Sequence, residues 1–96
     1  MNKAELADAL AERTNLPRKD SRAAVEALFD PETGLIAQAL QRGEKVSLTG
    51  FGTFEVRERK ARTARNPRTG MTIEVPATRA AAFRPGKGLK DGIARR

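Results

Sequence analysis

The chain has no cysteine, histidine, tryptophan or tyrosine. Without cysteine it has no disulfides and no thiolate metal sites, and without histidine it lacks the usual general base and zinc ligand. The acidic residues fall mainly in the first half, without a metal-binding cluster or a partner nucleophile. These absences argue against an enzyme. We expect a protein without a cofactor, a metal site or a small-molecule substrate.

Long apolar runs are also missing. No run approaches the ~18 residues of a membrane span, and the first residues lack the apolar region of a secretion signal. We therefore expect a cytoplasmic protein that does not bind membranes. Internal repeats and low-complexity linkers are absent too.

Apolar residues are scarce for a folded chain. Of the 96 residues 39% are hydrophobic, and the only aromatic residues are four phenylalanines. Globular domains usually contain about 45–50% apolar residues. A single domain of this length has a small core, and a projecting segment would reduce it further. We expect an obligate dimer that shares one core.

Positive charge is concentrated in the second half of the chain. The net charge of +7 divides into −2 for residues 1–56, +5 for residues 57–68 and +4 for residues 69–96. Scattered charge would serve solubility alone, so this concentration favours a polyanionic partner. A merely solvated basic surface is the alternative.

The first half predicts helices. Asn2 and Glu5 form a capping-box arrangement ahead of an apolar stripe, and residues 14–17 end that helix. A second helix carries apolar residues at helical spacing on both sides of residues 30–34 and ends near Gly43. Residues 30–34 predict a kink or break, because Pro31 and Gly34 both disfavour a helix interior. Either Asp30 caps a restarted helix, or these residues form a turn.

The second half predicts strands and a projecting β-ribbon. Residues 46–56 predict two short stretches of strand, with apolar and polar side chains alternating at residues 54–57, on either side of a sharp turn at Gly50 and Gly52. Residues 76–84 predict a return strand that runs toward Phe83. Between them, residues 57–75 read as two strands joined by a tight turn at residues 66–70. Residues 87–95 predict a short C-terminal helix. We therefore expect a single α+β domain over residues 1–96, with a helical base at residues 1–45.

The ribbon has cations on both faces and a proline at its tip. Because strand side chains alternate, Arg62 points away from Arg59 and Arg65 unless a bulge intervenes. Such a ribbon suits a groove with phosphates on both walls, although an exposed soluble hairpin is the alternative. By local chemistry alone, Pro67 is a turn former. The functional alternative is a wedge between base pairs.

The whole pattern resembles the HU and integration host factor family of bacterial nucleoid proteins, and HU most of all. The most specific matches are residues 50–54 (GFGTF), 62–70 (RTARNPRTG) and 83–87 (FRPGK). The resemblance implies an intertwined dimer, in which a helical base carries a three-stranded antiparallel sheet and two ribbon arms clasp bent DNA. One departure is the extra helical turn at residues 30–34, because the family usually runs an uninterrupted second helix.

The resemblance assigns two sets of residues. The implied DNA-binding residues are Lys3, Arg57, Arg59, Lys60, Arg62, Arg65, Asn66, Pro67, Arg68, Lys87 and Lys90, with Pro67 intercalating. The implied dimer core is Leu6, Leu10, Leu28, Phe29, Ile36, Leu40, Phe51, Phe54 and Phe83.

The implied function is architectural: binding and bending duplex DNA with little sequence specificity, preferring bent or nicked DNA, and compacting the nucleoid. The partner in the dimer is a second copy or a paralogue. One alternative is a site-specific bender like integration host factor. Another is an RNA-binding or ribosome-associated basic protein, which the lack of tyrosine and tryptophan for base stacking disfavours.

Overall fold

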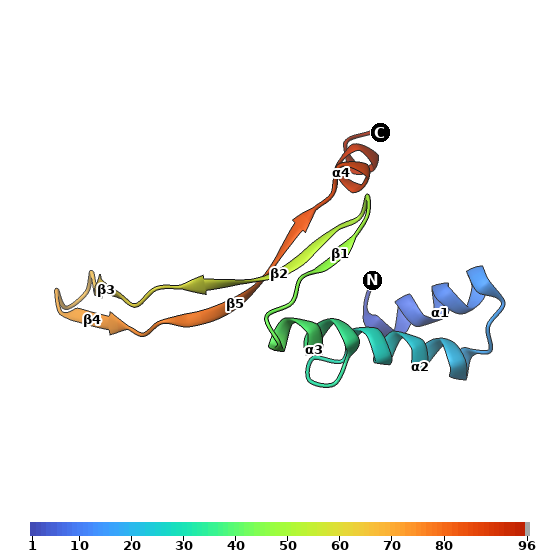
Figure 1. Ribbon diagram of the computed structural model, residues 1–96, viewed down its shortest axis with the longest axis horizontal. Coiled ribbons are helices and arrows are strands. Elements are labelled where there is room, and N and C mark those ends of the chain that lie inside the picture. The colour runs from blue at the N-terminus through green and yellow to red at the C-terminus, as the bar shows by residue number, and fades with distance from the viewer. Residues whose placement is uncertain (96) are drawn as a thin grey trace. The chain divides into compact units, whose positions relative to one another are not determined.

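The fold combines helices with antiparallel strands, as the α+β prediction required. The computed structural model describes residues 1–95, which contain four helices and five strands. They form two compact units, Met1–Arg42 and Gly43–Arg96, coloured from blue to green and from green to red in Figure 1. The first unit is helical, and the second contains the strands and the last helix.

The first two helices begin and end where local chemistry dictates. Helix α1 spans Lys3–Thr14, and the Asn2 side chain caps it by accepting a hydrogen bond of 2.8 Å from the Glu5 backbone N–H. Asn15 ends it in the left-handed conformation, with φ 59°. Helix α2 spans Arg18–Phe29, and Pro17 occupies its N-cap position. The predicted cap and stop are both confirmed.

Helices α1 and α2 pack through small side chains. Ala7, Ala11, Ser21 and Val25 are buried, and the Ser21 hydroxyl donates a 2.6 Å hydrogen bond to the Ala7 carbonyl oxygen. Short side chains let the two backbones approach closely, so that this single hydroxyl can bridge them. The same small residues bury little apolar area. Larger apolar side chains of this unit consequently remain at the surface.

Residues 30–34 form a turn, which is the second of the two predicted alternatives. The Asp30 carboxylate accepts hydrogen bonds from the backbone N–H groups of Glu32 and Thr33, at 2.9 and 2.8 Å. A Cβ atom at Gly34 would lie 2.6 Å from the Asp30 carbonyl oxygen, so a larger residue does not fit there. Helix α3 then spans Leu35–Gln41. The predicted break is confirmed.

The second unit contains a three-stranded antiparallel sheet in the order β1-β2-β5. Its strands are β1 (Val46–Leu48), β2 (Gly52–Arg59) and β5 (Thr78–Pro85). Directly paired residues share a face of the sheet. One face is therefore apolar, with Val46, Phe54 and Phe83 in register, and the other is polar, with Ser47, Thr53 and Arg84 in register.

A two-stranded ribbon continues this sheet without a change of register. Its strands are β3 (Arg62–Arg65) and β4 (Thr72–Val75). Arg59 pairs with Thr78 in the sheet and Arg62 pairs with Val75 in the ribbon, so both chains advance by three residues between the ladders. In this register Pro76 faces Ala61 and has no N–H to donate, which accounts for the interruption. No bulge intervenes between the two ladders.

The last helix, α4, spans Lys87–Ala94 and rests on the β1–β2 turn. The Gly86 backbone N–H donates to the Phe51 carbonyl at 2.8 Å, and the Leu89 N–H donates to the Gly50 carbonyl at 3.0 Å. A Cβ atom at Gly86 would lie 2.8 Å from the Gly50 oxygen. Only glycine permits this contact between two backbones, so it fixes where the helix starts.

Candidate nucleic-acid interface

The ribbon ends in the predicted tight turn. The Gly70 backbone N–H donates to the Asn66 carbonyl at 2.7 Å, and the Asn66 side-chain oxygen accepts from the Arg68 N–H at 2.9 Å. Gly70 has φ 71°, a conformation that glycine adopts without strain. Pro67, the second residue of this turn, is exposed. The Asn66 side chain therefore holds the turn that presents Pro67.

The register places arginines on opposite faces of the ribbon. Arg62 shares its face with Val75 and lies two residues from Ala64, which pairs with Ile73. Arg65 pairs with Thr72 and belongs to the other face. The prediction of cations on both faces is confirmed for Arg62 and Arg65. One face is mainly apolar and the other polar, so the two arginines have different surroundings.

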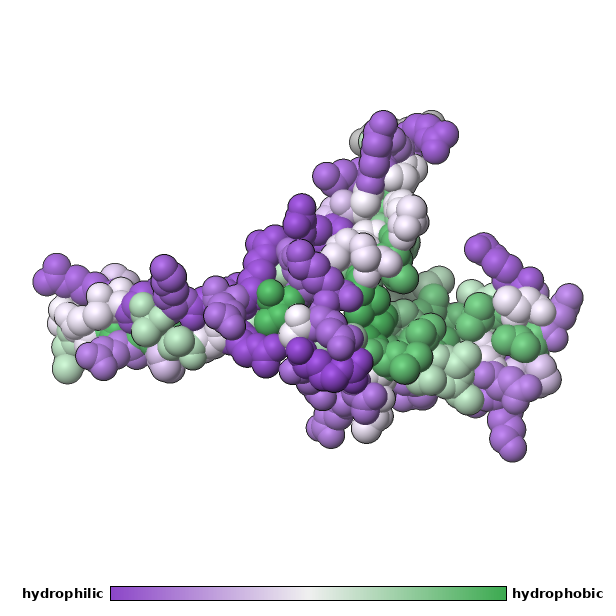
Figure 2. All heavy atoms as spheres, in the orientation of Figure 1, coloured by the Kyte–Doolittle hydropathy of each residue, from purple (hydrophilic) through white to green (hydrophobic). Residues whose placement is uncertain are grey.

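The ribbon cations are exposed and largely unneutralised. Among the residues that the structure describes, Arg59, Lys60, Arg62 and Arg68 have no ion-pair partner. The Arg65 guanidinium donates only to the Gly70 carbonyl, at 3.3 Å. Figure 2 shows hydrophilic side chains along this ribbon with less polar surface between them. Such cations can bind phosphates without first giving up an acidic partner.

The remaining predicted contacts divide between the two units. Lys87 and Lys90 are exposed on α4, in the same unit as the ribbon. Lys3 belongs to the helical unit, where its ammonium lies 2.6 Å from the Glu26 carboxylate. That hydrogen bond and the carboxylate charge raise the pKa of Lys3. Lys3 therefore stays charged and would have to exchange Glu26 for any phosphate.

The polar face of the sheet adds residues that the list of predicted DNA contacts omits. Lys45, Ser47, Thr53 and Arg84 lie on this face together with the predicted Arg57. The Ser47 and Thr53 hydroxyls are 3.1 Å apart. The alternation of polar residues along β1 and β2 carried this signal, because every second side chain of a strand shares a face. This polar face is a second cationic surface beside the ribbon.

The predicted core residues lie in both units, and many are only partly covered. Phe83 contacts Phe54 and Phe51, with ring centroids 4.8 and 5.8 Å apart. Phe51 nevertheless remains 49% exposed and Phe83 40% exposed. In the helical unit Leu6, Leu28 and Phe29 are also exposed, whereas Leu10, Ile36 and Leu40 are half-buried. Much of the apolar surface of these side chains is therefore in contact with solvent in a single chain.

Other kinds of site are not apparent in the part of the chain that the structure describes. Residues 1–95 contain no group of three or more acidic, histidine or cysteine side chains that could hold a metal ion. None of the helices assigned there is long and apolar enough to cross a bilayer. The cationic ribbon and the polar sheet face are thus the candidate functional surfaces.

The model of the bacterial DNA-binding protein family matches residues 1–94. The chain belongs to this family. The match covers both compact units, so the helical unit is as much part of the family's fold as the ribbon.

Individual members are HU proteins. The chain is 54% identical over 93 residues to the DNA-binding protein HU of Geobacillus stearothermophilus, covering 97% of this chain and 99% of that protein. It is 53% identical over 94 residues to the DNA-binding protein HU 1 of Bacillus subtilis strain 168, covering 98% of each. The fold matches a cocrystal structure of Anabaena HU with DNA at a TM-score of 0.85, with 45% identity and full coverage of both chains.

Proposed function

We propose that this chain is a non-enzymatic architectural protein that binds and bends duplex DNA with little sequence preference. In this role it compacts the bacterial nucleoid, as a dimer. The observation that carries the proposal is the ribbon: exposed arginines on both faces, and an exposed proline at the turn. The Anabaena HU structure, which contains DNA, supports the choice of partner.

Contacts to phosphates explain how such a ribbon would bind DNA without a preferred base sequence. Arginines on both faces match a groove whose two walls are lined by phosphates, and the narrow minor groove attracts arginine strongly. Phosphates carry no sequence information, so these contacts position the protein without selecting a site. The ribbon therefore accounts for general binding.

Bending is the role proposed for Pro67. An apolar wedge that enters between base pairs unstacks them and kinks the duplex. Pro67 suits this role because it is exposed and held in a turn closed by two hydrogen bonds. The unstacking costs a few kcal/mol, which the additional phosphate contacts of bent DNA offset.

A second copy of the chain is the proposed cover for the exposed apolar side chains. The buried apolar residues of residues 1–95 are Ala7, Ala11, Val25 and Ala39, which make a very small core. Phe29 is 45% exposed and Leu35 63% exposed. Each fully buried large side chain would contribute about 1.5–3 kcal/mol to stability. Dimerisation would supply that burial and bring two ribbons to one DNA molecule.

A titration of fluorescent duplex DNA against salt tests the proposal. The logarithm of the binding constant should fall by about 0.9 per neutralised phosphate for each unit of log salt. A flat salt dependence would contradict it. Selection from random duplexes should return no strong consensus, whereas a consensus would favour a site-specific bender. Preference for structured RNA over nicked duplex would favour the RNA-binding alternative.

A further inference from the structure

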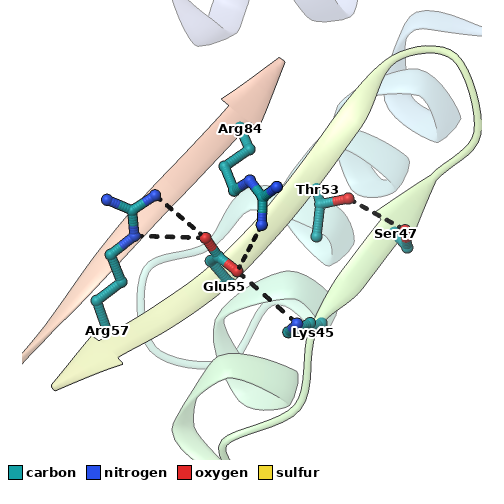
Figure 3. A network of polar contacts seen from close by, with 6 residues as sticks. All are labelled: Lys45, Ser47, Thr53, Glu55, Arg57 and Arg84. Atoms are coloured by element: carbon teal, nitrogen blue, oxygen red, sulfur yellow. Dashed lines mark hydrogen bonds and ion pairs between the residues drawn. The ribbon is translucent and has the colours of Figure 1, made fainter. Parts of the chain in front are cut away.

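A buried carboxylate lies at the centre of the polar sheet face. Glu55 is in the middle of β2, and its side chain is 10% exposed. Three cations surround it, as Figure 3 shows: the Arg57 guanidinium at 3.3 Å, the Arg84 guanidinium at 3.8 Å and the Lys45 ammonium at 4.0 Å. These cations come from β2, from β5 and from the residue before β1. The carboxylate thus links β2 to β5 and to the residue that precedes β1.

The three cations are much more exposed than the anion beneath them. The side chains of Lys45, Arg57 and Arg84 are 68%, 61% and 64% exposed. Their charged groups can therefore reach a ligand above the sheet while the carboxylate stays below. A buried carboxylate without partners is costly, and the three nearby cations offset that cost for Glu55.

The cations of the sheet differ from those of the ribbon because they share an acidic partner, Glu55. Arg59 and Arg62 have no acidic partner among the residues described, whereas the sheet cations share one. A phosphate that binds over the sheet must compete with the Glu55 carboxylate for the N–H donors of Arg57 and for the ion pairs with Arg84 and Lys45. It also meets the negative charge of that carboxylate. The sheet face therefore binds phosphate more weakly than its three cations alone would.

We propose that Glu55 is a positioning residue that sets the affinity of the sheet for DNA phosphates. Its carboxylate holds Arg57, Arg84 and Lys45 against the sheet and withholds about one phosphate contact from the duplex. The inference rests on the proposed function, because it assumes that DNA is the polyanion above this face. Glu55 thereby lowers the affinity for DNA without regard to sequence. The ribbon contributes cations that have no acidic partner within residues 1–95.

The test is Glu55→Gln, which keeps the size of the side chain and an acceptor oxygen but removes the charge. If one more phosphate is neutralised, the slope of log K against log salt steepens by about 0.9. The affinity for an intact duplex should then rise, and the rise should be about 3.5-fold larger at 50 mM than at 200 mM salt. Circular dichroism at each condition verifies that the variant is folded.

Two matched variants separate charge at this site from other effects. Glu12→Gln makes the same change of net charge on exposed α1 and should leave the slope at the wild-type value. Glu55→Asp shortens the side chain but keeps its charge, so it should also keep the wild-type slope. In a protein that already carries Arg57→Gln and Arg84→Gln, adding Glu55→Gln should raise the affinity for DNA only slightly, because the two guanidinium groups that it would release are missing.

The outcomes distinguish the inference from the function on which it rests. If wild-type protein binds duplex DNA with a steep salt dependence and Glu55→Gln behaves like Glu12→Gln, the inference is wrong and the proposed function stands. If Glu55→Gln binds more weakly, the carboxylate does not compete with phosphate, and the inference is equally wrong. If wild-type protein does not bind duplex DNA at all, the proposed function fails and the inference falls with it.

Discussion

The opposite orientation of Arg62 and Arg65 leads to a quantitative prediction. The unbroken register places them on different faces of the ribbon, so they cannot share one phosphate. Arg62→Gln and Arg65→Gln should each remove one phosphate contact. The salt slope should then become shallower by about 0.9 for each single variant and by about 1.8 for the double variant.

The loss of these contacts also changes the affinity for DNA. Each phosphate contact makes the binding constant fall by a further factor of about 3.5 between 50 and 200 mM salt. The binding constant of the double variant should therefore fall about twelvefold less over that range than that of wild type. Fluorescence anisotropy of an end-labelled duplex, repeated at several salt concentrations, measures both quantities. Arg22→Gln, an exposed residue of α2, is the charge-matched control and should leave the slope unchanged.

Non-additive slopes would contradict the placement of Arg62 and Arg65 on opposite walls of a groove. If the double variant has the same slope as either single variant, the two arginines act on one phosphate and lie on one side of the groove. If neither single variant differs from Arg22→Gln, the ribbon does not contact phosphates, and the candidate interface lies elsewhere.

Three further predictions concern stability. Gly52→Ala would place a Cβ atom 2.5 Å from the Phe83 ring and should lower the free energy of unfolding by about 3 kcal/mol in urea titrations. Gly50→Ala has open space around it and should lower the free energy of unfolding by only about 1 kcal/mol. Equal losses in the two variants would contradict the packing of Gly52 against Phe83. Backbone N–H groups lower the pKa of Asp30, so its charge stabilises the fold above pH ~4 and this contribution is lost as pH falls through the folded pKa. Wild type should accordingly be more stable than Asp30→Asn at pH ~6, and the difference between their melting temperatures should shrink as the pH falls through the folded pKa of Asp30; a difference that stays constant with pH would exclude the charge effect. If a second copy covers the apolar side chains, the melting temperature should rise with protein concentration, and independence from concentration would argue for a stable monomer.

Much of the fold follows from local chemistry that is legible in the sequence. The Asn2 cap, the stop before Pro17 and the turn at residues 66–70 each depend on side chains within a few positions of one another. Proline and glycine at residues 30–34 likewise indicated the break between α2 and α3. The sequence did not decide whether Asp30 caps a restarted helix or begins a turn, because its carboxylate can accept hydrogen bonds from the following backbone N–H groups in either case.

The sheet network is harder to predict from the sequence, because it depends on pairing between distant strands. Glu55 and Arg84 are 29 positions apart, and only the β2–β5 register brings them to one face. Sequence alternation identifies the polar side of each strand but not which strands are neighbours. The resemblance to a family implied DNA contacts on the arm and did not include Lys45 or Arg84.

The most direct test of the central claim is a measurement of the bend that the ribbon tip is proposed to produce in DNA. In an energy-transfer assay on a duplex labelled at both ends, saturating wild-type protein should bring the ends closer together. Pro67→Ala should bind with an affinity within about threefold of wild type, since the phosphate contacts remain, but should produce clearly less transfer. Equal transfer by the two proteins would contradict the wedge, and no transfer with bound wild-type protein would contradict bending altogether.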